Sequence, residues 1–169
     1  MNKISWRRIL GISLAGILFL VTACTSAPPS RFDQAQQEST SRGATSVVKE
    51  SESGGSFNSY FPESSSGYQL TFSQEKKGFA EAKLKKDGKE VAVMAISDTL
   101  NNPSARKKFQ NSTNEIKGYP SVSQGKNATA VLVDDRFQVK VLSRNSSFTE
   151  DDRLDWLQKF DLSGLSRLK

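Results

Sequence analysis

The amino-acid sequence predicts an α+β fold, in which helices pack on an antiparallel sheet of about six strands. Two observations lead to this prediction. Apolar and polar residues alternate over several short stretches from Tyr68 on, which is typical of half-buried strands. Two other stretches begin with helix-start residues, and the second continues with apolar residues at helical spacing.

The first strands are predicted from alternation and from one turn. Residues 68–72 and 80–84 place apolar side chains at every second position, so one side of each strand is apolar. Asp87-Gly88 predicts a tight turn, because this pair suits a two-residue hairpin loop. In residues 91–96 both alternating sets are apolar, which predicts a central strand that is covered on both sides.

A helix is predicted next, and further strands follow it. Asn102-Pro103 predicts a helix that runs through Phe109, with Asn as the cap and Pro at the first helical position. Gly118 and Pro120 then mark the return to extended chain. The remaining strands are expected at residues 121–124, 128–133 and 136–142, with a turn at Asp134-Asp135 between the last two.

A capping box predicts the last helix. Thr149 is followed three residues later by Asp152, a spacing at which each side chain can cap a backbone N–H group of the other. Leu154, Leu157 and Phe160 place an apolar stripe on the helix that begins there.

The two halves of this region parallel each other. Each has a hairpin turn that contains Asp and a helix that contains a Phe, namely Phe109 in the first half and Phe160 in the second. The sequence therefore suggests a (βββα)2 arrangement in one domain of about 110 residues. This arrangement resembles the sheet-and-helix sandwich of the PsbP proteins of the oxygen-evolving complex, some of whose bacterial relatives are lipoproteins.

The amino terminus has the three parts of a secretory signal. Residues 1–8 are basic, residues 9–21 are apolar and uncharged, and small residues stand immediately ahead of Cys24. As a helix the uncharged stretch would reach only about 22 Å, against a hydrocarbon core of about 30 Å, so a signal peptide is preferred to a membrane-spanning helix.

The segment Leu20-Val21-Thr22-Ala23-Cys24 resembles the lipobox of bacterial lipoproteins. The resemblance implies that the signal peptide, residues 1–23, is removed and that Cys24 is acylated. Acyl chains such as palmitate would then hold the protein at a membrane surface on the extracytoplasmic side, in the periplasm or an equivalent compartment.

Residues 24–55 are expected to form the lipidated start and a flexible tether. They are rich in Ser, Thr, Gly, Pro and Gln and lack sustained apolar periodicity, so they cannot bury enough surface to offset their ordering entropy. About 30 flexible residues reach on the order of 30 Å. Phe57, Tyr60 and Phe61 are predicted to be the first segment that docks on the domain, which is expected to span residues 56–169.

Composition excludes several kinds of site. The chain has no His and only one Cys, which removes the usual general base at neutral pH and any disulfide or thiolate zinc site within one chain. No cofactor and no metal is expected. Of the formal charge of +6, +3 lies in residues 1–23, which hold three bases and no acid. Residues 24–66 hold three bases against five acids, which leaves about +5 for the rest of the chain.

Two motifs are compatible with catalysis but have simpler explanations. Ser-x-x-Lys occurs at Ser46 and at Ser104, without the Ser-Asp-Asn and Lys-Thr-Gly motifs that accompany it in penicillin-binding enzymes. Asp134-Asp135 and Glu150-Asp151-Asp152 could form a carboxylate pair or bind a cation. Their positions at a turn and at a helix start account for them without function.

Basic residues on two strands form the candidate partner site. Lys83 and Lys85 alternate with apolar residues on one strand, and Arg136 and Lys140 do so on another. If the two strands are neighbours, their outer sides form one basic face that could attract an acidic protein or anionic headgroups. An ordinary solvated sheet face is the alternative. Nucleic acid is not expected, because no aromatic residues lie between the basic ones.

Three functions remain compatible with these features. The leading expectation is a non-catalytic, membrane-anchored binding or assembly module for a membrane protein complex. The alternative is a carrier that shields a lipid or other apolar ligand between sheet and helices. The third is an enzyme that uses Ser, Lys or carboxylates alone. A large lined cavity would favour the carrier, whereas a filled core beside a basic face would favour the binding module.

Overall fold

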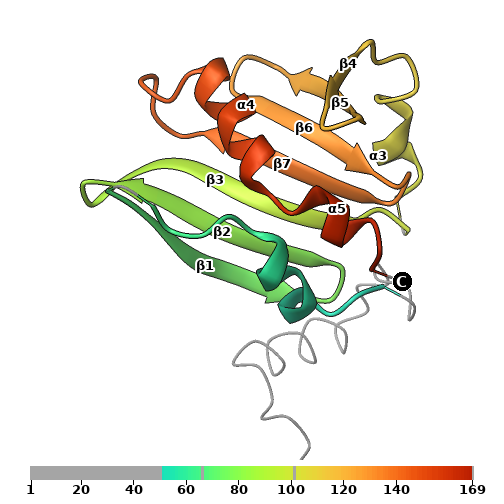
Figure 1. Cartoon of the computed structure of the whole chain (residues 1–169), viewed down its shortest axis with the longest axis horizontal. Helices are drawn as coiled ribbons and strands as arrows, with labels where there is room; N and C mark the ends of the chain where they lie inside the picture. The colour runs from blue at the N-terminus through green and yellow to red at the C-terminus, as the bar shows by residue number, and fades with distance from the viewer. Residues whose placement is uncertain (1–50, 66, 101, 169) are drawn as a thin grey trace, which may run out of the picture.

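The computed structural model describes residues 51–65, 67–100 and 102–168, which form one seven-stranded antiparallel sheet with short helices (Figure 1). The strands are β1 (Tyr68–Lys76), β2 (Phe79–Lys86), β3 (Lys89–Asp98), β4 (Asn114–Ile116), β5 (Tyr119–Gln124), β6 (Ala128–Val133) and β7 (Phe137–Ser143). The helices are η1 (Gly54–Tyr60), α3 (Ser104–Lys107), α4 (Glu150–Lys159) and α5 (Leu162–Leu165). The order across the sheet is β1-β2-β3-β7-β6-β5-β4, so β3 and β7 meet at its centre.

The predicted α+β class and both predicted turns are confirmed. Asp87 and Gly88 have φ angles of 50° and 77°, and Asp134 and Asp135 have φ angles of 50° and 49°. Two successive residues at positive φ are what a tight hairpin of this twist requires, and Asp tolerates that region better than most residues.

The sheet has seven strands where the sequence predicted about six. The additional strand is β4, which pairs with β5 through residues 114–116. It was missed because it has only three residues, of which Ile116 alone is buried, so it shows no alternation. Lys117 and Gly118, with φ angles of 52° and 81°, make a further tight turn before β5.

The (βββα)2 arrangement is not confirmed. The second half has four strands, and α3 is a single turn, whereas α4 has ten residues. The helix predicted to run through Phe109 therefore ends early, at Lys107. The chain that follows α3 places Phe109 against Ala130 and Leu132 on one side of β6, while α4 covers the other side.

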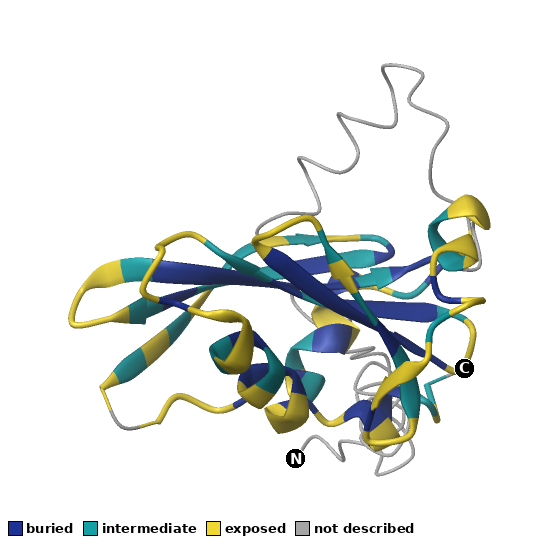
Figure 2. Cartoon of the chain, turned by 90° about the horizontal axis from the view of Figure 1, so that it is seen from above, coloured by how far each residue is buried: buried dark blue, intermediate teal, exposed yellow. Residues whose placement is uncertain are grey.

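The main core lies between the sheet and the layer made by η1, α4 and α5. Figure 2 shows the buried residues along the central strands and on the helices. Phe57 of η1 is completely buried and packs edge-to-face on Phe137, with ring centroids 5.9 Å apart. Phe61 lies 5.2 Å from Phe160 between ring centroids. The prediction that the segment around Phe57 and Phe61 docks on the domain is therefore confirmed.

The chain is already packed before η1, in residues that the sequence assigned to the tether. The Glu52 carbonyl accepts a hydrogen bond from the Gly78 N–H at 2.6 Å. Gly54 lies so close to β1 and β2 that a Cβ atom would be 2.5 Å from the Lys76 nitrogen. Within the described residues no helix is long and apolar enough to cross a membrane.

Candidate functional site

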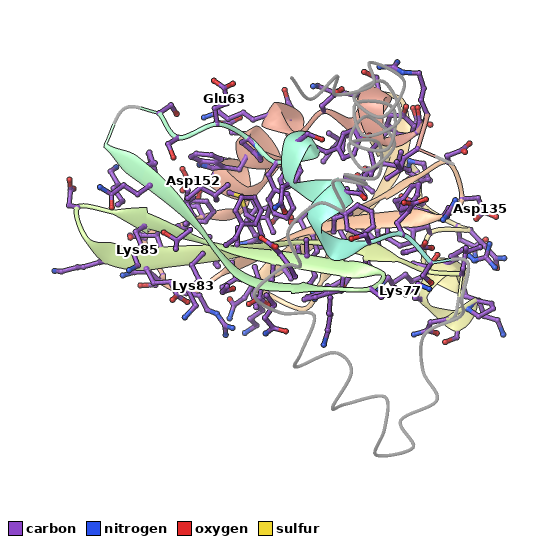
Figure 3. All side chains as sticks on the ribbon, turned by 90° about the horizontal axis from the view of Figure 1, so that it is seen from below. Glu63, Lys77, Lys83, Lys85, Asp135 and Asp152 are labelled. Atoms are coloured by element: carbon purple, nitrogen blue, oxygen red, sulfur yellow. The ribbon has the colours of Figure 1, made fainter. Side chains whose placement is uncertain are left out.

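Two of the predicted site residues project from the side of the sheet opposite α4, which we call the outer side. Leu84 of β2 is fully buried in the main core. Lys83 and Lys85, its neighbours in the strand, therefore point the other way. Figure 3 shows both lysines on the side of the sheet away from Glu63 and Asp152.

The two basic strands are not neighbours, because β3 lies between them. Glu81 of β2 pairs with Ala95 of β3, which pairs in turn with Lys140 of β7. Paired residues in adjacent strands share one side of a sheet, so Lys140 is also on the outer side. The structure thus brings Lys83, Lys85 and Lys140 to one side, separated by the small apolar residues of β3, and we call these three residues the lysine face.

Two acids, Glu81 and Glu90, lie on the same side of the sheet as these lysines. Glu90 forms ion pairs with Lys83 at 3.4 Å and with Arg144 at 3.7 Å, and it pairs with Lys85 across the strands. These side chains are about a third to a half exposed, so each ion pair contributes little to stability. Glu90 nevertheless reduces the positive potential at the β2 end of the lysine face.

The other end of the lysine face is more strongly basic. Burial lowers the pKa of Lys108, and repulsion by the Lys140 ammonium lowers this pKa further. The two ammonium groups are therefore close enough to interact. Within the described residues neither lysine forms an ion pair.

Arg136 does not belong to the predicted basic face. Its guanidinium donates to the Asp98 carboxylate, at 2.8 Å from Nη2 and 3.3 Å from Nε, and lies 3.8 Å from Glu52. Burial would raise the pKa of Asp98, but hydrogen bonds from Arg136, Leu100 and Glu52 together outweigh burial and hold it below its ordinary value. Arg136 therefore joins the start of the described chain to the end of β3 and the start of β7.

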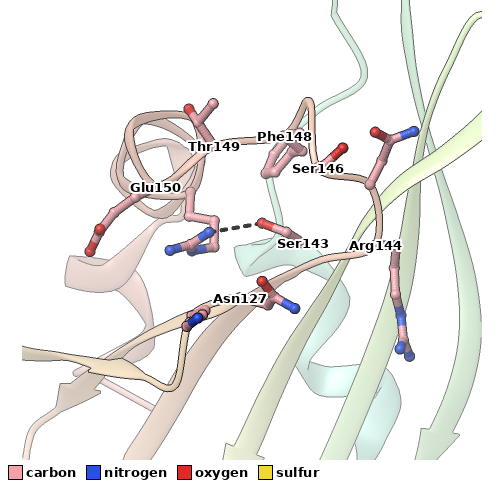
Figure 4. A pocket seen from close by; sticks show the side chains of 10 residues that line it. Asn127, Ser143, Arg144, Ser146, Phe148, Thr149 and Glu150 are labelled. Atoms are coloured by element: carbon pink, nitrogen blue, oxygen red, sulfur yellow. Dashed lines mark hydrogen bonds between the residues drawn. The ribbon is translucent and has the colours of Figure 1, made fainter.

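A pocket that the sequence did not predict lies beside the start of α4. It has a volume of about 330 Å³. Its lining combines the β5–β6 turn, the end of β7, the loop after it and the first residues of α4, as Figure 4 shows. The lining side chains are Lys126, Asn127, Ser143, Arg144, Asn145, Ser146, Phe148, Thr149, Glu150 and Arg153.

The most unusual residue of this pocket is Arg153, whose exposure is 3%. Its Nε donates to the Thr129 hydroxyl at 3.0 Å, and its Nη1 donates to the Ser143 hydroxyl at 2.9 Å, the bond dashed in Figure 4. No carboxylate of the described residues forms an ion pair with it. A buried guanidinium held by neutral hydroxyls alone is uncommon, since buried charges are usually paired.

One signal in the sequence could have revealed Arg153. The buried residues of α4 and its end are Arg153, Trp156, Leu157 and Phe160. Their spacing is that of a helical apolar stripe, and Arg153 is the one charged residue in it. A charge at a position of the stripe predicts either a buried partner or a binding site.

A second pocket, of about 420 Å³, lies on the other side of the first turn of α4. Strands β4, β5 and β6 contribute to it together with Glu150 and Leu154. The Glu150 carboxylate accepts a hydrogen bond from the Ser123 hydroxyl at 2.8 Å, which joins α4 to β5. Both pockets are small and have polar lining residues.

The motifs weighed for catalysis do not form a cluster. The Ser104 hydroxyl donates to Asn102 at the start of α3, and Lys107 is exposed. Asp152 forms the predicted capping box with Thr149, which confirms its structural role. Among the described residues no group of three or more acidic, His or Cys side chains could hold a metal ion. The first Ser-x-x-Lys motif and Cys24 lie outside the described residues.

No known protein family, no curated protein and no solved structure matches this chain.

Proposed function

We propose that the protein is a membrane-anchored extracytoplasmic lipoprotein whose domain is a non-catalytic binding module. Acyl chains on Cys24 would hold it at the membrane, and the lysine face would contact an acidic surface of a membrane protein complex. The lipobox supports the anchor, and the lack of His supports a role without acid–base catalysis at neutral pH.

The observation that carries the proposal is the composition of the outer side of the sheet. Three lysines from β2 and β7 surround Val93 and Ala95 of β3, which are only 5% and 4% exposed. Because Val93 and Ala95 are almost completely buried, the longer side chains around them form the exposed part of this surface, and three of these are lysines. Such a surface suits a protein partner of opposite charge, since charge complementarity speeds association and selects the partner.

The filled core favours this function over a carrier. The layer between the sheet and α4 is occupied by large side chains that are fully buried, among them Phe57, Phe137 and Phe160. The two pockets described above have polar lining residues. A carrier of an apolar ligand would need an apolar cavity instead.

The experiment is affinity purification of the tagged full-length protein from native membranes in mild detergent, followed by mass spectrometry. We expect one membrane complex in stoichiometric amount from the wild type, and its loss when Lys83, Lys85 and Lys140 are all changed to Glu. A control with the same change of charge elsewhere, at the exposed positions Lys117→Glu, Lys159→Glu and Arg167→Glu, should still recover it. Equal recovery by both variants, or recovery of the protein with only a bound lipid, would contradict the proposal.

Glu90 provides a second, opposite variant for this experiment. Glu90→Gln removes the acid that lies between Lys83 and Arg144, so the lysine face becomes more positive. We expect tighter binding of the complex, mainly through faster association, and a steeper loss of binding as salt is raised. Weaker binding by this variant would show that the attraction is not electrostatic.

A further inference from the structure

We propose that the pocket beside the start of α4 binds a phosphate group and that Arg153 is the residue that holds it. This inference does not depend on the lysine face, which lies on the other side of the sheet. It rests on a buried positive charge without an acidic partner, on the cavity that this charge lines, and on the donors around the cavity.

The buried charge is the first argument. Removing a guanidinium from water is costly unless an anion compensates the charge. Arg136 shows how the same domain handles this requirement, with Asp98 at 2.8 Å and Glu52 at 3.8 Å. Arg153 is more deeply buried than Arg136, with an exposure of 3%, yet its hydrogen-bond partners Thr129 and Ser143 are neutral. An anion in the pocket would supply the missing charge.

The donors that line the cavity are the second argument. A guanidinium has five N–H donors, and two atoms of Arg153 already donate to hydroxyls, which fix the plane of the group. Lys126, Asn127, Asn145 and Ser146 line the same cavity and can donate from other directions. A phosphate has enough oxygens to accept from several of these groups, whereas a carboxylate would leave most of them unused.

Two other charged side chains of the cavity, Arg144 and Glu150, already have partners. Arg144 forms its ion pair with Glu90 at 3.7 Å, and Glu150 accepts from Ser123 at 2.8 Å. Glu150 adds a negative charge to the lining, but even without Arg144 the two bases Lys126 and Arg153 outnumber it. The net positive lining favours an anion over a cation.

The size of the cavity indicates more than an inorganic ion. Its volume of about 330 Å³ lies at the lower end of the range of small-molecule sites, roughly 300 to 1,000 Å³. The ligand class is therefore a phosphate ester. Its source is either a soluble molecule or the headgroup of a phospholipid.

Thermal unfolding of the full-length protein in a phospholipid-free, non-ionic detergent tests the proposal. Three probes are compared with chloride at equal ionic strength: inorganic phosphate, glycerol phosphate, and phosphatidylglycerol added to the micelles. We expect a rise in Tm with increasing probe, because a ligand that binds only the folded state stabilises it. A rise with glycerol phosphate identifies a soluble ester as sufficient, whereas a rise with phosphatidylglycerol alone identifies a lipid headgroup.

Arg153→Met is the decisive variant. Met has a similar length and no charge, and exchanging a buried charge for an apolar group of similar volume often preserves or raises stability. We expect this variant to fold and to lose the response to the probes, with binding weaker by about tenfold or more. Arg106→Met, at an arginine that pairs with Asp135 outside the pocket, should respond as the wild type does.

Further variants keep the test decisive. If Arg153→Met fails to fold, Lys126→Met changes an exposed residue of the same lining and should also weaken the response. The variant with Lys83, Lys85 and Lys140 changed to Glu should keep the response to inorganic phosphate, which separates this site from the lysine face. No response of the wild type to any probe, or an undiminished response in Arg153→Met or Lys126→Met, would overturn the proposal.

Discussion

At the scale of single residues, the half-buried Arg136 and the buried Arg153 have different surroundings. Arg136 donates to Asp98 and lies near Glu52, so its charge is compensated within the chain. Arg153 donates only to hydroxyls of β6 and β7. The first arrangement fastens the chain start to the sheet, and the second leaves a charge for a ligand. The sequence marks Arg153 as a charge within the apolar stripe of α4, but it does not show which of the two arginines has an acidic partner.

Asp98→Asn should lower the free energy of unfolding at neutral pH by about 3 kcal/mol, because it leaves the Arg136 charge poorly compensated in a buried place. Urea unfolding monitored by tryptophan fluorescence measures the change. Asp155→Asn, at an exposed position of α4, is the control and should change it by less than about 0.5 kcal/mol.

Asp98 also predicts how the free energy of unfolding changes at acid pH. The pKa of Asp98 is lower in the folded state than in the unfolded state, so its contribution is fully present above the unfolded value and is lost as the pH falls toward the folded one. The difference in stability between wild type and Asp98→Asn should therefore shrink below about pH 4. A difference that stays constant from neutral pH to pH 3 would contradict the assigned role of the carboxylate.

At the scale of elements, η1 shows how the polar chain start becomes part of the domain. Its seven residues contain two serines and two glycines, which gives no apolar periodicity. Phe57 fills the core, and Gly54 allows the backbone to approach β1 and β2 closely. These two contacts, the hydrogen bond from the Asn58 side chain to Glu75 and the packing of Tyr60 on the core hold η1 in place, and none of them depends on helix propensity.

Gly54→Ala should destabilise the domain by about 1 to 3 kcal/mol, because the new Cβ would meet backbone atoms of Lys76 and Phe79 at 2.5 to 2.7 Å. Gly55→Ala is the matched control, since nothing lies within 4 Å of its Cβ position. Chemical unfolding of both variants measures the difference. Equal stabilities would mean that η1 is not held against the sheet at this point.

At the scale of the whole molecule, the proposed function separates three tasks along the chain. In this proposal the acylated amino terminus would hold the protein at the membrane, the lysine face would contact a partner, and the pocket of Arg153 would take a phosphate ester. Arg153 and the three lysines lie on opposite sides of the sheet, and the ion pair between Arg144 of the pocket lining and Glu90 joins the two sites.

Cys24→Ser should move the protein from the membrane fraction to the soluble one, or leave a precursor that keeps residues 1–23. Two or more acyl chains make release from a membrane negligible, because each buried methylene contributes about 0.8 kcal/mol, and serine cannot carry the thioether. Cell fractionation and intact-mass analysis of the protein measure both outcomes. Thr25→Ser, at the next residue, should behave as the wild type does, and normal processing with membrane retention of Cys24→Ser would exclude the lipid anchor.

The sequence by itself determined the α+β class, the turns at Asp87-Gly88 and Asp134-Asp135 and the capping box at Thr149, because alternation, turn residues and caps act between residues that are close in the chain. Only the tertiary structure decided that β3 separates β2 from β7, that β4 is a strand, that Arg136 pairs with Asp98, and that Arg153 lines a pocket. These features depend on which distant segments pair, and strand pairing is set by the packing of the whole sheet rather than by any local pattern.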